Sequence, residues 1–294
     1  MIRNLLLGAF AAVLGLPVVA SAQVENGNVH DRVRGEASPG AEAPTRDELV
    51  NAIQTAAPGR LMAMLEYGEL VECHACVPLL ERNLLENGDA DVRRLSAWWL
   101  RRRNFAISAI MNRMRVTLES DSDPVRRARA ARAIGEFLDP NGLGPLTEAA
   151  TNDSDDGVRA AAVAALGRLN HPGGNVVIGA ALSDASVEVR RAAIDQVIMA
   201  HFFREHDALL GALGDSDNEV RMRAARLSGV FELNAAVPAL VGLLRGDAVR
   251  EVRQAAAWAL GKIGTAEATA ALREAMGTES ESLVRDAIEI AMRM

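Results

Sequence analysis

Aromatic residues are scarce in this sequence: Phe, Trp and Tyr make up only 3% of its 294 residues. Sheets of all-β proteins are enriched in aromatic and β-branched side chains, so the scarcity argues against a β-sandwich. Alanine, leucine, valine and arginine dominate instead, and most of these are good helix formers. The composition therefore favours a helical protein whose helices meet through small side chains.

The sequence also has no excess of basic residues. The formal net charge is −7, whereas nucleic-acid-binding domains usually show a basic footprint. The sequence has no glycine-rich phosphate loop, and no Ser-His-Asp set can be assigned from spacing. We therefore expect no nucleic-acid partner, no metal, no cofactor and no enzymatic activity.

Long apolar runs are confined to the N-terminus, which reads MIRNLLLGAFAAVLGLPVVASAQ. One arginine, an apolar stretch and the small residues Ala20 and Ala22 form the layout of a secretory signal peptide. The stretch is shorter than the roughly 20 residues of a transmembrane helix. We predict a signal peptide over residues 1–22, a mature chain from Gln23 without a membrane span, and a periplasmic or secreted protein. Residues 23–44 are polar and rich in Gly, Ala and Pro, which predicts a flexible leader.

Internal repeats are the strongest positive signal. The pair Val-Arg recurs every 31 to 33 residues, each time after an acidic turn, at Val92, Val125, Val158, Val189, Val220, Val252 and Val284. Aspartates such as Asp123 and Asp217 are suited to cap the following helix, and Pro124 suits a first helical position. Alanines at helical spacing predict closely packed helices. We expect the glycine that follows them, as at Gly135 or Gly261, to end the helix.

Two helices per repeat, with the pattern D-x-x-V-R-x-A-A-x-A-L-G in the second, resemble HEAT repeats, most closely the short bacterial variety related to phycobilisome lyases. The resemblance implies an all-α, right-handed α-solenoid of about seven helix pairs over residues 70–294, with residues 45–69 as an N-terminal helical cap. It also implies a structural ladder between neighbouring turns, formed by Arg93, Arg126, Arg159, Arg190, Arg221, Arg253 and Arg285.

Both cysteines of the chain, Cys73 and Cys76, lie in one C-x-x-C motif. Val77 follows the motif where haem attachment needs His, and two Cys with His74 are too few ligands for a zinc site. A structural disulfide is the favoured interpretation, because the motif lies in a turn before Pro78 that can bring the two Cβ atoms together. A redox role stays open, since thiols at a helix N-terminus have a lowered pKa.

The segment WWLRRR gives the N-terminal half of the array an aromatic and basic character. Between Leu80 and Arg132, twelve arginines face seven acidic residues. Trp and Arg are favoured anchors of protein interfaces. We predict a protein partner, for which an anionic surface would be complementary, at Arg94, Trp98, Trp99, Arg101, Arg102, Arg127 and Arg129. The expected function is an exported, non-catalytic scaffold for protein interactions; the alternative is a periplasmic thiol-disulfide or maturation factor acting through Cys73 and Cys76.

Overall fold

The computed structural model describes residues 43–200 and 203–294. The predicted signal peptide and nearly all of the predicted leader lie outside these residues. The described residues form sixteen α-helices and two short 3₁₀ turns, with no strand among them. The predicted all-α fold of paired helices is confirmed. The chain divides into two compact units, one up to Ile110 and one over Met111–Met294, which are described separately.

The first unit contains two helix pairs, which follow one another along the chain as α3 (Arg46–Thr55), α4 (Pro58–Tyr67), α5 (Cys76–Glu86) and α6 (Ala90–Leu100). A capping box between Thr45 and Glu48 opens α3. Helix α3 packs on α5, and α4 packs on α6. The predicted cap thus consists of one helix pair that covers the first predicted repeat.

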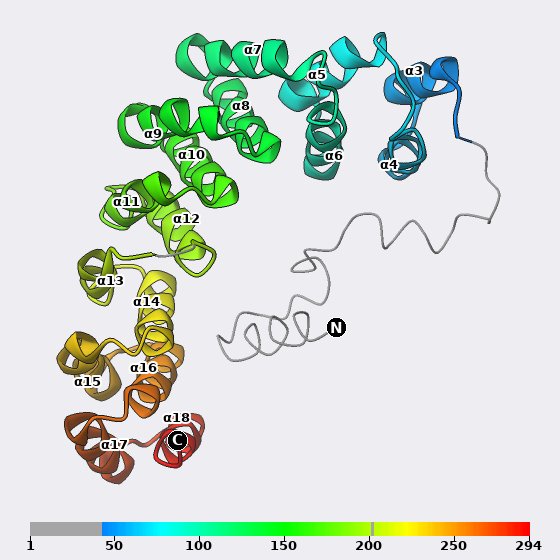
Figure 1. Cartoon of the computed structure of the whole chain (residues 1–294). Helices are drawn as coiled ribbons and strands as arrows, with labels where there is room; N and C mark the ends of the chain where they lie inside the picture. The colour runs from blue at the N-terminus through cyan, green and yellow to red at the C-terminus, as the bar shows by residue number, and fades with distance from the viewer. Residues whose placement is uncertain (1–42, 201–202) are drawn as a thin grey trace. The chain divides into compact units, whose positions relative to one another are not determined.

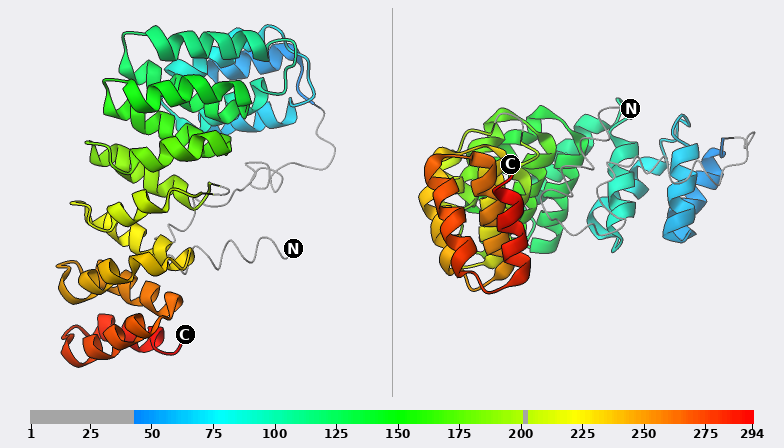
Figure 2. Two further views of the ribbon diagram at one scale, coloured as in Figure 1. Left: turned by 60° about the vertical axis from the view of Figure 1, so that its left-hand side comes forward. Right: turned by 90° about the horizontal axis from the view of Figure 1, so that it is seen from below.

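The second unit repeats this arrangement in two layers, which Figures 1 and 2 show from green to red. The first helices of each pair are α9 (Leu143–Asn152), α11 (Pro172–Ala181), α13 (His206–Ala212), α15 (Val237–Gly246) and α17 (Ala266–Thr278). Helix α7 (Ile107–Ser120) precedes them and begins in the first unit. The second helices carry the Val-Arg pairs and form the other layer: α8 (Pro124–Phe137), α10 (Asp156–Leu169), α12 (Val187–Val197), α14 (Asn218–Val230), α16 (Arg250–Ile263) and α18 (Ser282–Ala291).

The predicted helix starts are confirmed. The carboxylate of Asp123 accepts a hydrogen bond from the Val125 amide, and that of Asp217 accepts one from the Val220 amide. Pro124 is the first residue of α8, as expected. The acidic turns therefore satisfy amide groups that the first turn of a helix leaves without partners.

The predicted role of the glycines was wrong. Gly261 lies inside α16, and the helix ends at Gly264, whose φ of +66° is the left-handed conformation that glycine favours. A Cβ added to Gly261 would lie 2.8 Å from the Cα of Ala291 in α18. A Cβ added to Gly135 of α8 would likewise lie 2.8 Å from the Cα of Ala165 in α10. These glycines are needed because the backbones of neighbouring second helices touch there.

Candidate functional site

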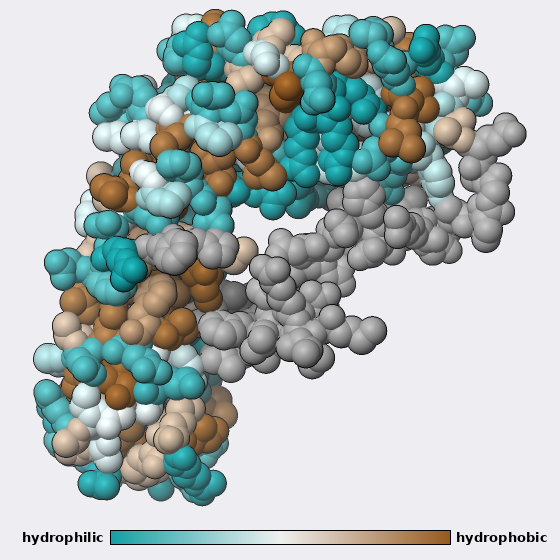
Figure 3. All heavy atoms as spheres, in the orientation of Figure 1, coloured by the Kyte–Doolittle hydropathy of each residue, from teal (hydrophilic) through white to brown (hydrophobic). Residues whose placement is uncertain are grey.

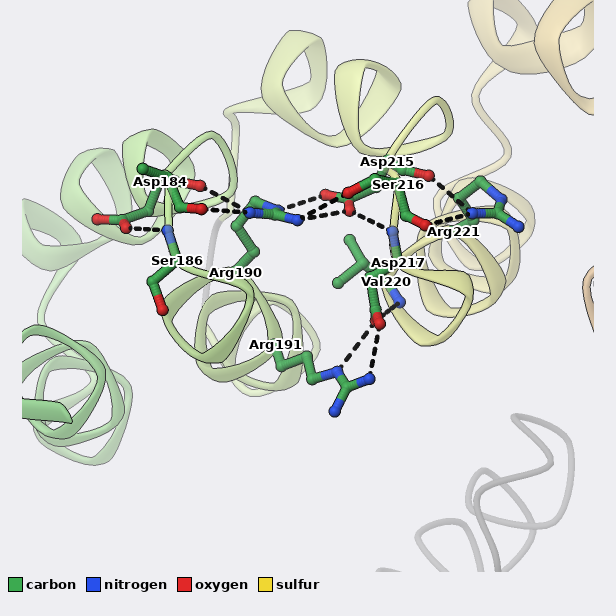
Figure 4. Close-up of polar contacts among 10 residues, drawn as sticks. Asp184, Ser186, Arg190, Arg191, Asp215, Ser216, Asp217, Val220 and Arg221 are labelled. Carbon is green, nitrogen blue, oxygen red and sulfur yellow. Dashed lines mark hydrogen bonds and ion pairs between the residues drawn. The ribbon is translucent and has the colours of Figure 1, made fainter. Parts of the chain in front are cut away.

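The most regular polar feature of the second unit is a ladder of arginine–carboxylate pairs along the turns before the second helices (Figure 4). Each arginine holds the carboxylate of the next turn through two nitrogen–oxygen hydrogen bonds of 2.6 to 3.4 Å. The pairs are Arg127–Asp153, Arg159–Asp184, Arg190–Asp215, Arg221–Asp247 and Arg253–Glu279. Such two-pronged contacts are stronger and more directional than single ones.

Each rung is also tied to the backbone on both sides. The Arg190 guanidinium donates to the carbonyl of Asp184, 2.9 Å away, in its own turn. The Asp215 carboxylate that it binds accepts a second bond, from the Asp217 amide at 2.8 Å. The other four rungs repeat both contacts. The ladder therefore joins each turn to the next through side chains that are largely buried.

The charges of the ladder stabilise one another. The hydrogen bond from Arg159 is the largest cause of the lowered pKa of Asp184, and burial opposes it. For Asp215, burial acts most strongly and would raise the pKa, but the bonds from Arg190 and the Asp217 amide outweigh it, so the pKa is lowered. Both carboxyl groups thus stay ionised well into the acid range.

Two predicted ladder positions need correction. In the second repeat Arg127 forms the rung, and Arg126 instead bonds Asp121 in its own turn at 2.8 Å. The Val-Arg pair of that repeat is one residue out of register with the others. Arg285, in the last helix, is exposed and makes no ion pair within the described part of the chain. Arg93 donates to the carbonyls of Asn87 and Gly88, which is the backbone half of a rung.

The predicted partner residues separate into buried and exposed ones. Trp99 is fully buried, and its indole Nε1 donates to the Gly68 carbonyl at 3.4 Å, so it cannot contact a partner. Arg127 is a rung of the ladder and is equally unavailable. Trp98 is half-buried, and the Arg102 guanidinium stacks 4.1 Å from its ring centroid while pairing with Glu69.

Arg94 is exposed and pairs with Asp91, whereas Arg101 is half-buried. Together with Trp98 and Arg102 they place a basic and aromatic strip on one side of α6. Arg129 is half-buried on α8 in the second unit.

Arg103 is not among the predicted site residues, yet it is central to the first unit. Its guanidinium lies 3.6 Å from the centroid of the Trp99 ring and donates to the carbonyls of Glu69 and Val71. Burial lowers its pKa, which the nearby Glu69 carboxylate counteracts. Arg103 fixes the turn between α4 and α5, and only its surroundings in the fold distinguish it from the two arginines before it.

Cys73 and Cys76 lie in this same turn, with their sulfur atoms 2.08 Å apart and their Cα atoms 5.3 Å apart. Both side chains are buried, with exposed fractions of 1% and 0%. His74 between them is exposed and lies against the ring of Phe105, with centroids 4.2 Å apart and the two rings tilted by 40°. The geometry fits a disulfide, and the oxidised state of the pair stays a prediction.

A groove of about 500 Å³ lies near the first rung of the ladder, between the end of α7 and helix α9. Its charged lining includes Asp153, which is bound by Arg127, and Asp121, which is bound by Arg126. No cluster of three metal-ligating side chains occurs in residues 43–200 and 203–294. Within the same ranges no helix has the length and apolar character needed to cross a membrane.

Two solved structures share this architecture at low sequence identity. YibA of Escherichia coli is 14% identical, with a TM-score of 0.58 over 92% of this chain and 99% of its own. Kap95p, in a structure with RanGDP, is 15% identical, with a TM-score of 0.59 over 98% of this chain but only 41% of the matched chain. The CpcE–CpcF complex of phycocyanin lyase from a Nostoc species is 22% identical over 74% of this chain and 93% of the matched one, with a TM-score of 0.40. No curated protein matches the sequence.

The match to a protein family is more extensive. The description of HEAT repeats fits residues 77–167, 115–199 and 206–293, which is well over half of the sequence. These matches include every rung of the ladder, so the resemblance predicted from the Val-Arg repeats is confirmed. This chain belongs to the family of HEAT-repeat proteins.

Proposed function

We propose that this HEAT-repeat protein is an exported, non-catalytic scaffold that binds other proteins through the outward face of its second helices. HEAT repeats as a family suggest a repeat-built interaction scaffold. The outward face here means the side of the second helices that faces away from the first-helix layer.

The observation that carries the proposal is a contrast between two positions of the repeat. The arginine that follows the Val position is engaged within the array in repeat after repeat. The position six residues after that Val, or seven in the second repeat with its shifted register, is exposed or half-buried throughout and differs between neighbouring helices: Trp98, Arg132, Ala164, Asp195, Arg226, Trp258 and Ile290. A position that stays accessible but varies in chemistry contributes little to stacking, so it is available to determine what binds.

The strip on α6 is the proposed contact for an anionic partner. It offers Arg94, Arg101 and Arg102 around the half-buried Trp98. Arginine and tryptophan combine a large contact area with charge or hydrogen bonding, which is why they dominate interface energetics. An acidic surface on the partner would be complementary to this strip.

Affinity capture from periplasmic extract tests the strip. We expect the double substitution Arg94→Glu with Arg101→Glu to reduce capture of the bound protein several-fold, and more strongly at low salt. The control is Arg245→Glu with Arg273→Glu, which makes the same charge change on the first-helix layer and leaves capture intact. Equal losses for both variants, or no loss for either, would remove α6 from the proposed binding surface.

Export rests on the N-terminal sequence. We expect Edman sequencing of the protein purified from periplasm to begin at Gln23, as the A-x-A site before it requires. A protein recovered only from the cytoplasm, beginning at its first residue, would refute this part of the proposal and would also undermine the predicted disulfide.

The alternative of a thiol-disulfide factor is disfavoured by burial. A partner thiolate has to reach one of the two sulfur atoms, and both cysteine side chains are covered. We expect the double substitution Cys73→Ser with Cys76→Ser to lower the free energy of unfolding by roughly 2 kcal/mol and to leave capture unchanged. A stable double variant that loses its biological activity would instead support redox work.

A further inference from the structure

The outward face of the second unit changes character along its length. In the first part of the face, Glu136 of α8 and Arg168 of α10 form an ion pair of 2.9 Å across the two helices. The small Ala164 lies one turn before Arg168 on the same side of α10. The charges of this pair neutralise each other, and Ala164 offers little apolar surface.

Trp258 of α16 dominates the later part of the face. A Cβ added to Gly229 of α14 would lie 2.7 Å from Cζ3 of the Trp258 ring, so the ring lies directly on the backbone of the neighbouring helix. Trp258 is half-buried, and its indole N–H has no acceptor among the described residues. The equivalent position on the next helix is Ile290, whose side chain is 58% exposed. Figure 3 shows brown apolar residues among teal polar ones over the part of the molecule that contains α14 to α18.

One cationic group lies beside this aromatic ring. The Lys262 ammonium, one helical turn after Trp258, is 6.0 Å from the ring centroid and makes no ion pair within the described residues. That distance is at the outer limit of a cation–π contact, so the ammonium remains free to bind an anion.

We propose that Trp258, Lys262 and Ile290 form a binding site for an acidic peptide segment of a partner protein that carries an aromatic or aliphatic side chain next to a carboxylate. The carboxylate accepts hydrogen bonds from the Lys262 ammonium and the Trp258 indole, while the apolar side chain covers Trp258 and Ile290. The site deepens the proposed scaffold function and rests on it. A nucleic acid is the weaker fit, because the site offers a single ammonium group, that of Lys262, whereas a phosphate backbone is bound by several cationic side chains.

Peptides of defined composition test the site. The probe is a fluorescein-labelled octapeptide of alternating Glu and Phe, titrated with the full chain and followed by fluorescence anisotropy. The comparison peptides alternate Lys with Phe, or Glu with Ser. We expect the Glu–Phe peptide to bind at least tenfold more tightly than either, with an affinity that falls as salt rises. Equal binding of all three peptides, or tighter binding of a labelled oligonucleotide, would overturn the proposal.

Substitutions locate the binding. Lys262→Gln should weaken binding of the Glu–Phe peptide about three- to fivefold. Lys262→Arg, which keeps the charge, should retain the affinity. Trp258→Ala should weaken it more than tenfold. Because Trp258→Ala also leaves space above Gly229, its thermal unfolding is measured in parallel. Lys262 is exposed to solvent, so Lys262→Gln decides the matter even if the tryptophan variant fails to fold.

Lys262 is the only lysine of the sequence, which gives an independent readout. Amine acetylation in the folded protein therefore reports on this one side chain and on the N-terminus. We expect the Glu–Phe peptide to slow acetylation of Lys262 at least threefold and to leave that of the N-terminus unchanged. Unchanged acetylation with peptide bound would place the peptide elsewhere. Periplasmic partners still captured by Lys262→Gln and Trp258→Ala would then show that the scaffold function stands without this site.

Discussion

The turn edge and the outward face of the second unit both display cationic side chains, but in opposite situations. At the turn edge, Arg190 binds the Asp215 carboxylate and the Asp184 carbonyl, and little of it remains exposed. On the outward face, Lys262 is exposed and makes no ion pair within residues 43–200 and 203–294. The ladder repeats with little change, whereas the face is different on each helix. This difference separates the side chains that hold the repeats together from those available for recognition.

The largest expected effect comes from adding a methyl group where the backbones of two second helices touch. Gly261→Ala should lower the free energy of unfolding by about 2–3 kcal/mol, because its Cβ would overlap the backbone of Ala291. Gly242→Ala in α15 is the matched control: nothing lies within 4 Å of the added Cβ, so the higher helix propensity of alanine should stabilise the protein by up to about 1 kcal/mol. Urea unfolding followed by circular dichroism measures both, and a harmless Gly261→Ala would contradict the close approach of α16 and α18.

Removal of one ladder carboxylate is expected to have the next largest effect on stability. Asp215→Ala should cost about 2–3 kcal/mol of unfolding free energy, since it leaves the largely buried Arg190 guanidinium without its partner. The control is Glu274→Ala, which breaks the exposed pair with Arg245 and should change stability by less than about 0.5 kcal/mol. Similar losses in the two variants would mean that the ladder is no stronger than an ordinary surface ion pair.

Substitutions of two neighbouring arginines test the register of the second repeat. Arg127→Ala should cost about 1–2 kcal/mol in thermal or urea unfolding, because Asp153 and the carbonyl of Asp121 lose their donor. Arg126→Ala removes the more exposed pair with Asp121 and should cost less than about 0.5 kcal/mol. The reverse order of effects would restore the register predicted from the Val-Arg spacing.

The smallest expected effect is the contribution of one carboxyl group to the dependence of stability on pH. The folded-state pKa of Asp184 is lowered, chiefly by Arg159, so its contribution is complete above the unfolded value of about 3.9 and is lost as the pH falls through the folded value. Urea titrations between pH 6 and about pH 2 should therefore show a smaller loss of stability on acidification for Asp184→Ala than for the wild type. Parallel curves for the two proteins would mean that Asp184 has the same pKa in the folded and unfolded chain.

The sequence predicted much of the architecture because helices and their starts depend on local interactions. The carboxylate of Asp217 reaches an amide only three residues away, and Pro124 needs no partner at all in the first turn. The spacing of the Val-Arg pairs measured the length of one helix pair directly. The ladder followed from the resemblance to HEAT repeats, and four of its arginines, from Arg159 to Arg253, lie where that resemblance placed them.

The candidate binding surface could not be derived in the same way, because exposure depends on which neighbour covers a side chain. Trp98 and Trp99 are adjacent in sequence, yet one faces outward and the other is buried beneath Arg103 and the turn that holds the cysteines. Nothing local distinguishes them, since a helix presents successive residues about 100° apart and its orientation is set by the helices it packs against.

The sequence by itself determined that this protein is an array of short helix pairs with capped starts, since those features depend on hydrogen bonds spanning a few residues. Only the tertiary structure decided that Gly261 lies in a helix contact instead of a helix end, and that Trp258 is held over Gly229 beside Lys262. Both depend on the approach of neighbouring helices to within van der Waals distance, which is a property of the stack and not of any one repeat.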